Sequence, residues 1–173
     1  MISQSTNISE LLKELTLDSN YYYLKSKNLI AYKNKDHTLY SKFKKVNKKL
    51  TSNDLKEHIN KNQTIAIALN SNNTLVYEYY GKSIFAFGAL LYKISKDEDI
   101  KEFLIIDYSD TKLVIFLKLN TNSSEKLRQI QNRIEKTLKE YIEKEWRVIP
   151  TNLKPEVGNL LILPREVIDN PWS

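Results

Sequence analysis

The fold prediction starts from residues 64–82, TIAIALNSNNTLVYEYYGK. Residues 64–69 are almost wholly apolar, which is typical of a short strand covered on both faces. Residues 71–73, Ser-Asn-Asn, favour a tight turn because such side chains hydrogen-bond to their own backbone. In the following strand, residues 74–80, side chains alternate between the two faces. Glu78 therefore stands near the strand end among tyrosines, which makes its carboxylate a candidate site residue.

Helical and extended patterns flank this stretch on both sides. Apolar residues at helical spacing predict helices after Asn7, after Thr51, after Ser83, and from Ser124 to about Trp146. Apolar runs predict strands over residues 21–25, 28–33, 102–108, 113–119, 147–150 and 158–164. The first two runs are separated by Ser-Lys and are expected to form a hairpin or two edge strands.

The order of these elements predicts an α+β protein with an α/β-like alternation. Residues 1–173 are expected to form a single domain, in which helices flank a central mixed sheet. Residues 1–50 supply an N-terminal helix, a hairpin and a basic loop, and residues 51–173 supply the core. Residues 33–49 show no clear period and are predicted to be that exposed loop.

Composition excludes several kinds of chemistry. The chain has no cysteine, so disulfides, a thiolate nucleophile and an iron–sulfur cluster are excluded. Only two histidines are present, and His58 is predicted to take a surface or capping role at the end of its helix. No apolar run reaches membrane-spanning length, and the N-terminus lacks the layout of a signal peptide. These features predict a cytoplasmic protein without a resident cofactor or metal.

Positive charge is concentrated in one segment. Residues 24–62 contain 11 lysines and 3 acidic residues, a balance of +8, whereas the whole chain carries +6. Such a segment is typical of a phosphate-binding surface, which predicts nucleic acid as a partner. The candidate binding residues are Lys25, Lys27, Lys33, Lys35, Tyr40, Lys42, Phe43, Lys44, Lys45, Lys48 and Lys49.

Aromatic residues are interleaved with these lysines. Tyr40 and Phe43, with Tyr32 and residues 21–23 as further rings, suit stacking on unpaired bases while lysines follow the backbone. Two alternatives stay open: the rings pin the segment to the core, and the lysines serve solubility.

Several features follow one another in a recognisable order. They are the unit at residues 64–82, the apolar helix after Ser83, the hairpin IIDYSDTKLVIFLKL at residues 105–119, and GNLLILP at residues 158–164. Together they resemble the prim-pol domain of the archaeo-eukaryotic primases, especially the small primase–polymerases of plasmids and viruses. The resemblance implies a prim-pol or RRM-like core and a place in DNA replication or repair.

The same resemblance implies that catalysis has been lost. The family places two acids on one strand face to hold metal ions. Glu78 falls on the first position and Tyr80 on the second, where tyrosine cannot chelate magnesium. The hairpin also lacks the family's histidine. The resemblance thus implies a non-catalytic primase-like protein that binds single-stranded or primer–template nucleic acid, or acts as an accessory subunit beside a primase or polymerase.

Two other hypotheses remain open at this point. A divergent, active nucleotidyltransferase would use Glu78, Asp107 and Asp110 as ligands of Mg²⁺ or Mn²⁺. A protein-interaction module or inhibitor would bind no nucleic acid.

Overall fold

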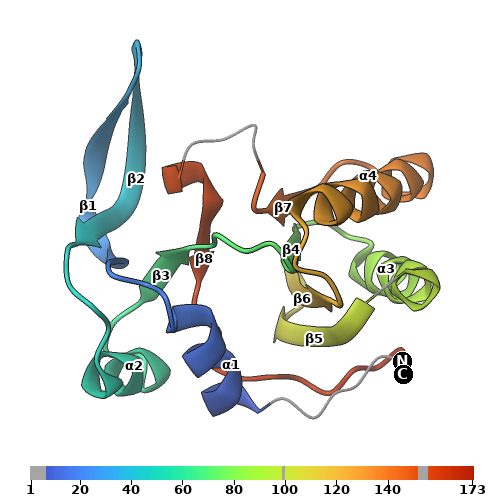
Figure 1. Cartoon of the computed structure of the whole chain (residues 1–173), viewed down its shortest axis with the longest axis horizontal. Helices are drawn as coiled ribbons and strands as arrows, with labels where there is room; N and C mark the ends of the chain where they lie inside the picture. Colours follow the sequence, from blue (N-terminus) through green and yellow to red (C-terminus); the bar gives the residue numbers. More distant parts are fainter. Residues whose placement is uncertain (1–6, 99, 152–155) are drawn as a thin grey trace. The chain divides into compact units, whose positions relative to one another are not determined.

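The computed structural model describes residues 7–98, 100–151 and 156–173 (Figure 1). Its strands form two four-stranded sheets, and the chain divides into two compact units that hold one sheet each. We call Asn7–Leu69 with Thr151–Arg165 the ribbon unit, and Asn70–Pro150 with Glu166–Ser173 the helix-covered unit. The predicted α+β class is confirmed.

The ribbon unit is built around a sheet with strand order β2-β1-β3-β8. Its elements are α1 (Ile8–Thr16), β1 (Tyr22–Asn34), β2 (His37–Val46), α2 (Ser52–Ile59), β3 (Ile65–Ala68), the 3₁₀ helix η1 (Glu156–Asn159) and β8 (Leu160–Ile162). Both helices begin with capping boxes, formed by Asn7 with Glu10 and by Thr51 with Asp54. Each box satisfies backbone N–H groups that a helix start otherwise leaves unpaired.

The prediction for the first strands was wrong in its connectivity. Residues 21–25 and 28–33 do not form a hairpin, because β1 runs unbroken from Tyr22 to Asn34. The intervening Ser-Lys dipeptide lies in a register irregularity between Lys25 and Ile30, where the Asn28 N–H donates to Ser26 Oγ at 3.2 Å. A bulge of this kind absorbs turn-forming residues without reversing the chain.

The exposed loop predicted for residues 33–49 was also wrong. Most of this segment is β2, which pairs with β1 along nearly its whole length. Half-buried Leu39, Ser41 and Phe43 alternate with exposed neighbours, so the period of two is present. It was hidden because both faces carry polar residues, which removes the apolar contrast that marks a strand.

The helix-covered unit has strand order β5-β6-β4-β7. Its elements are β4 (Thr74–Tyr79), α3 (Ile84–Asp97), β5 (Ile100–Tyr108), β6 (Leu113–Leu119), α4 (Ser124–Tyr141) and β7 (Trp146–Ile149). α3 and α4 cover one face of this sheet and enclose its main core (Figure 1). The predicted hairpin at residues 105–119 is confirmed, since β5 and β6 pair around a turn closed by the Ser109 N–H and the Lys112 carbonyl at 2.8 Å.

The end of α4 differs from the prediction, which extended this helix to about Trp146. α4 is capped by Ser123, whose hydroxyl accepts from the Lys126 N–H, and it ends at Tyr141. Ser83 makes no side-chain cap for α3; its own N–H donates to the Tyr79 hydroxyl at 3.0 Å.

The central mixed sheet is replaced by two sheets whose paired strands all run antiparallel in the described residues. β3 pairs with β1 and β8, whereas β4 pairs with β6 and β7. Residues 70–73 therefore connect two sheets and are not the turn of a hairpin. The sequence could not show this, because short apolar strands carry no information about their partners.

No helix among the described residues is both long and apolar enough to cross a membrane.

Candidate nucleic-acid interface

β1 and β2 form a long two-stranded ribbon. Only Tyr23 and Leu24 of β1 pair with β3, so the ribbon extends well beyond the rest of its sheet (Figure 1). At its tip, Lys35 and Asp36 make a two-residue turn, in which Lys35 adopts a left-handed φ of 53°. Such turns let two strands reverse within a tight space.

One face of this ribbon is basic. Ala31 is paired with Tyr40, and Lys33 with Thr38, and paired residues of an antiparallel ribbon share a face. Because side chains alternate along a strand, Lys42 and Lys44 project on the same side as Tyr40. We call this set the basic face; all of its members are exposed: Ala31, Lys33, Thr38, Tyr40, Lys42 and Lys44.

All nine lysines predicted to bind nucleic acid are exposed. Two of them have acidic partners: Lys45 Nζ lies 3.7 Å from Glu156, and Lys48 Nζ lies 3.7 Å from Asp54. The other seven make no ion pair with any carboxylate in the described residues; they are Lys25, Lys27, Lys33, Lys35, Lys42, Lys44 and Lys49. Their charge is therefore available to an external anion.

The aromatic residues of the ribbon divide between packing and exposure. Tyr40 is 68% exposed. Phe43 and Tyr32 instead pack against the small core around Tyr23, and the Tyr32 hydroxyl donates to the Phe43 carbonyl at 2.6 Å. Tyr22 is buried. Of the two rings named as binding residues, Tyr40 faces solvent and Phe43 belongs to the packing.

A carboxylate that the sequence did not single out fixes the base of the ribbon. Glu156 accepts hydrogen bonds from the hydroxyls of Tyr21, at 2.6 Å, and Tyr23. The bond to Glu156 and, to a smaller extent, burial raise the pKa of Tyr21 to about 12. Burial, followed by the bond to Glu156, raises the pKa of Tyr23.

These contacts also stabilise the charged form of Glu156. Burial acts to raise the pKa of this carboxyl, but the two phenols and Lys45 outweigh burial and hold it below its ordinary value. Glu156 therefore ties η1 to β1 and β2 as an anion. The two tyrosines lie 135 and 133 residues from Glu156 in the sequence, and no local sequence signal reveals a contact at that range.

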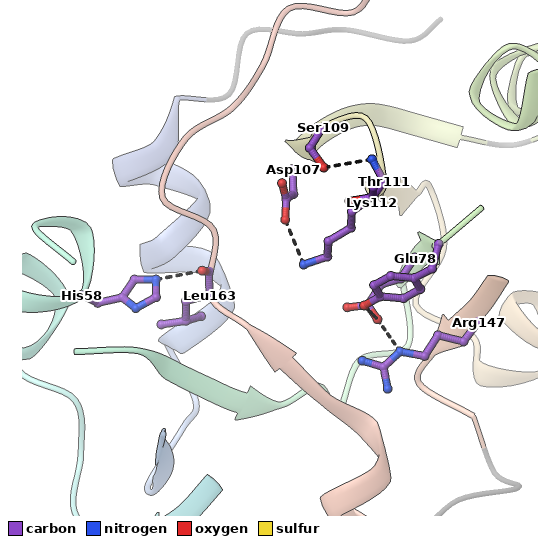
Figure 2. Close-up of polar contacts among 9 residues, drawn as sticks. His58, Glu78, Asp107, Ser109, Thr111, Lys112, Arg147 and Leu163 are labelled. Atoms are coloured by element: carbon purple, nitrogen blue, oxygen red, sulfur yellow. Dashed lines mark hydrogen bonds and ion pairs between the residues drawn. The ribbon is translucent and has the colours of Figure 1, made fainter. Parts of the chain in front are cut away.

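The carboxylate of Glu78 is paired inside the helix-covered unit. Glu78 is opposite Arg147 in the β4–β7 register, and Arg147 Nε donates a hydrogen bond to Glu78 Oε2 (Figure 2). The Tyr80 hydroxyl donates to the same carboxylate at 3.0 Å. Burial and the charge of Glu78 raise the pKa of Tyr80 to about 12. Glu78 is 4% exposed, and its carboxylate is paired with Arg147 in a structural role.

The other two predicted acids lie in the β5–β6 hairpin. Asp107 makes an ion pair of 2.8 Å with Lys112 (Figure 2), and Asp110 is an exposed residue of the turn. Within the described part of the chain, no three acidic or histidine side chains gather closely enough to hold a metal ion. The structure therefore does not bring Glu78, Asp107 and Asp110 together as a metal site.

His58 is fully buried, so the predicted surface or capping role was wrong. Its Nδ1 accepts from the Ile65 N–H at 3.0 Å, and its Nε2 lies 2.8 Å from the Leu163 carbonyl (Figure 2). This pattern requires a neutral ring with the proton on Nε2. Burial lowers the pKa of His58, and the charge of nearby Arg165 acts in the same direction. His58 thus joins α2 to β3 and to the segment after β8.

The fold and the ribbon define an α+β protein with one basic, solvent-facing β ribbon. The sequence pattern of one family, described as a domain of unknown function (DUF1882), matches residues 9–77, from α1 into β4. No curated protein matches the chain. The family match includes the whole ribbon and its basic face.

The resemblance to the prim-pol domain was wrong, because the family that matches is not a primase family. The structure shows why the sequence motifs suggested the wrong family. β3 and β4 lie in different sheets, and Gly158 and Asn159 of GNLLILP belong to η1 rather than to a strand. The similarity was confined to short apolar runs in a shared order, and such runs occur in many folds.

Proposed function

We propose that this chain binds nucleic acid through the basic face and the exposed lysines beside it. The observation that carries the proposal is the set of seven exposed lysines that have no ion-pair partner among the described carboxylates. Lysines that neutralise phosphates release the cations condensed on a nucleic acid, and this release favours binding. The +8 balance of residues 24–62 gives such a ligand a strong electrostatic attraction.

The composition of the basic face supports binding without sequence preference. Lysine contacts phosphate as a point charge, whereas base recognition relies chiefly on side chains with paired donors and acceptors. The basic face carries lysine, threonine, alanine and tyrosine, and no arginine, asparagine or glutamine. Its contacts therefore suit the backbone of the nucleic acid.

The test compares two triple variants of equal charge. In the first, Lys33, Lys42 and Lys44 of the basic face are changed to glutamine. In the control, exposed lysines of the helix-covered unit are changed in the same way: Lys93, Lys101 and Lys136. Binding to labelled oligonucleotides, single-stranded and duplex, is measured by fluorescence anisotropy over a range of salt concentrations.

The first variant is expected to bind more weakly than the control and to depend less on salt. Each lost phosphate contact lowers the slope of log K against log salt by about 0.7 for a single strand and about 0.9 for a duplex. Three contacts lower it by about 2 to 3. Absence of binding by the unmodified chain at low salt, or equal effects of the two variants, would overturn the proposal.

A further inference from the structure

We infer that the nucleic acid on the basic face is an unpaired strand, one base of which stacks on the Tyr40 ring. This inference rests on the proposed function and adds the class of nucleic acid and its position. The Tyr40 side chain is 68% exposed and stands opposite Ala31, whose methyl group is too small to cover an aromatic ring. Thr38 and Lys42, its neighbours along the strand on the same face, are also exposed.

Tyr40 differs from the other tyrosines at the ribbon. Lys45 Nζ lies 3.8 Å from the centre of the Tyr21 ring, and Lys48 Nζ lies 5.9 Å from that of Tyr22. The remaining two, Tyr23 and Tyr32, are 6.4 Å apart in an edge-to-face contact.

In contrast, no ring or cation of the described residues contacts Tyr40. Its aromatic surface is therefore open to an external partner.

Positive charge surrounds this open ring. Lys42 follows Tyr40 by two residues on β2, and Lys33 stands diagonally across on β1, each about 7 Å away along the ribbon. Proteins that bind single strands combine these two elements, with cations that follow the backbone and rings that take the bases. The charge is complementary to a nucleic-acid strand, and the ring is complementary to the exposed face of a base.

A duplex fits these observations less well. Bases inside a duplex already stack on their neighbours and present only their edges in the grooves. A ribbon placed in the major groove would bring Tyr40 to those edges, where its ring has no stacking partner. The basic face also lacks the arginine, asparagine and glutamine side chains that read base edges most effectively. The geometry therefore favours an unpaired strand.

The experiment replaces Tyr40 by alanine and by phenylalanine. Tyr141→Ala is the matched control, because Tyr141 is 70% exposed and lies on α4 in the other unit. Affinities are measured for a labelled thymidine oligonucleotide and for a blunt duplex of the same length. A second oligonucleotide carries one 2-aminopurine, whose fluorescence is quenched when the base stacks.

Tyr40→Ala is expected to weaken single-strand binding by roughly five- to 150-fold, the range that corresponds to one base stacked on an aromatic ring. Tyr40→Phe and Tyr141→Ala are expected to bind like the unmodified chain, because both variants keep an aromatic ring at position 40. Quenching of 2-aminopurine is expected to disappear in Tyr40→Ala alone. Duplex binding is expected to be weaker than single-strand binding and insensitive to Tyr40.

Two results would overturn the inference and leave the proposed function intact. One is a lysine-dependent affinity that is equal for duplex and single strand. The other is unchanged single-strand affinity and quenching in Tyr40→Ala. If neither oligonucleotide binds at low salt, the proposed function itself fails.

Discussion

Tyr40 and Ala31 lie directly opposite each other in the β1–β2 ribbon, and the tyrosine ring gains almost nothing from that pairing. A cross-strand aromatic pair contributes about 0.2–1 kcal/mol relative to an alanine pair, and a single methyl group provides little of this. We therefore expect Tyr40→Ala to change the free energy of unfolding by no more than about 0.5 kcal/mol.

Phe43→Ala provides the comparison on the same strand, because Phe43 packs against the core of the ribbon unit. Full burial of a phenylalanine would make its loss cost about 3–5 kcal/mol, and a half-buried ring is expected to cost about 1–3 kcal/mol. Urea unfolding of both variants measures the difference. Equal destabilisation by the two substitutions would contradict the distinction drawn between an exposed and a packed ring.

Glu78 and Arg147 give a second prediction, on stability in the helix-covered unit. Glu78→Gln removes the negative charge and leaves the Arg147 guanidinium, whose side chain is 40% exposed, without its partner. Breaking a buried pair costs about 3–5 kcal/mol and an exposed one less than about 1 kcal/mol. Because this pair is intermediate in burial, we expect a loss of about 2 kcal/mol in urea unfolding.

The control for this substitution is Glu135→Gln on α4, where Glu135, 21% exposed, lies 3.8 Å from the exposed Lys139. Its expected effect is below about 0.5 kcal/mol. Changing Arg147 to methionine in the Glu78→Gln background is expected to restore part of the lost stability, since no charge then remains unpaired. Failure of the second substitution to recover any stability would argue against the ion pair as the cause.

His58 gives a prediction on pH dependence. In the unfolded chain this ring titrates near its ordinary pKa of 6.5, whereas burial lowers its pKa in the folded protein. Below pH 6.5 the unfolded state therefore binds more protons than the folded state. Stability is expected to fall as the pH drops through this range, by at most about 1.4 kcal/mol per pH unit.

The measurement is the free energy of unfolding in urea between about pH 7.5 and about pH 5.5, on either side of the ordinary histidine pKa. His58→Gln is expected to be less stable at neutral pH by about 1–3 kcal/mol, because buried backbone partners lose hydrogen bonds. It should also lack the histidine-dependent part of the decline. His37→Gln is the control, since His37 is exposed at the start of β2. A decline of the same size in all three proteins would exclude His58 as its source.

Local signals in the sequence were sufficient for much of the secondary structure. Polar residues at the helix starts and apolar residues at helical spacing predicted the helices after Asn7 and Thr51, and the turn after Tyr108 predicted the β5–β6 hairpin. The pairing of the other strands was not predictable: β3 and β4 are adjacent in the chain and yet belong to different sheets. Pairing depends on contacts between distant segments, which the apolar pattern of one strand does not encode.

The candidate interface could also be predicted only in part. Charge counting located the lysines, because exposure of lysine is the ordinary outcome. It could not separate Tyr40 from Phe43, which are three residues apart in the sequence and lie on opposite faces once β2 forms. Glu156 was missed because its partners Tyr21 and Tyr23 are brought to it only by the tertiary fold.

Gly88 and Trp172 provide the last prediction. Gly88 lies within α3, and a Cβ atom added there would overlap the indole ring of Trp172. That ring cannot move away freely, because it packs against Phe85, Phe103 and Tyr108, with centroid distances of 5.7, 6.5 and 6.4 Å.

In an unobstructed helix, glycine to alanine would stabilise by about 1 kcal/mol through helix propensity. Overpacking against a held ring costs about 1–3 kcal/mol, so Gly88→Ala is expected to destabilise the protein or, at best, to leave its stability unchanged. The effect should reverse when Trp172 is first replaced by alanine, because the added methyl group then enters open space and only the gain in helix propensity remains. Urea unfolding of the two single variants and the double variant measures this change of sign. Stabilisation by Gly88→Ala in the presence of Trp172 would show that the indole does not occupy the space beside this glycine.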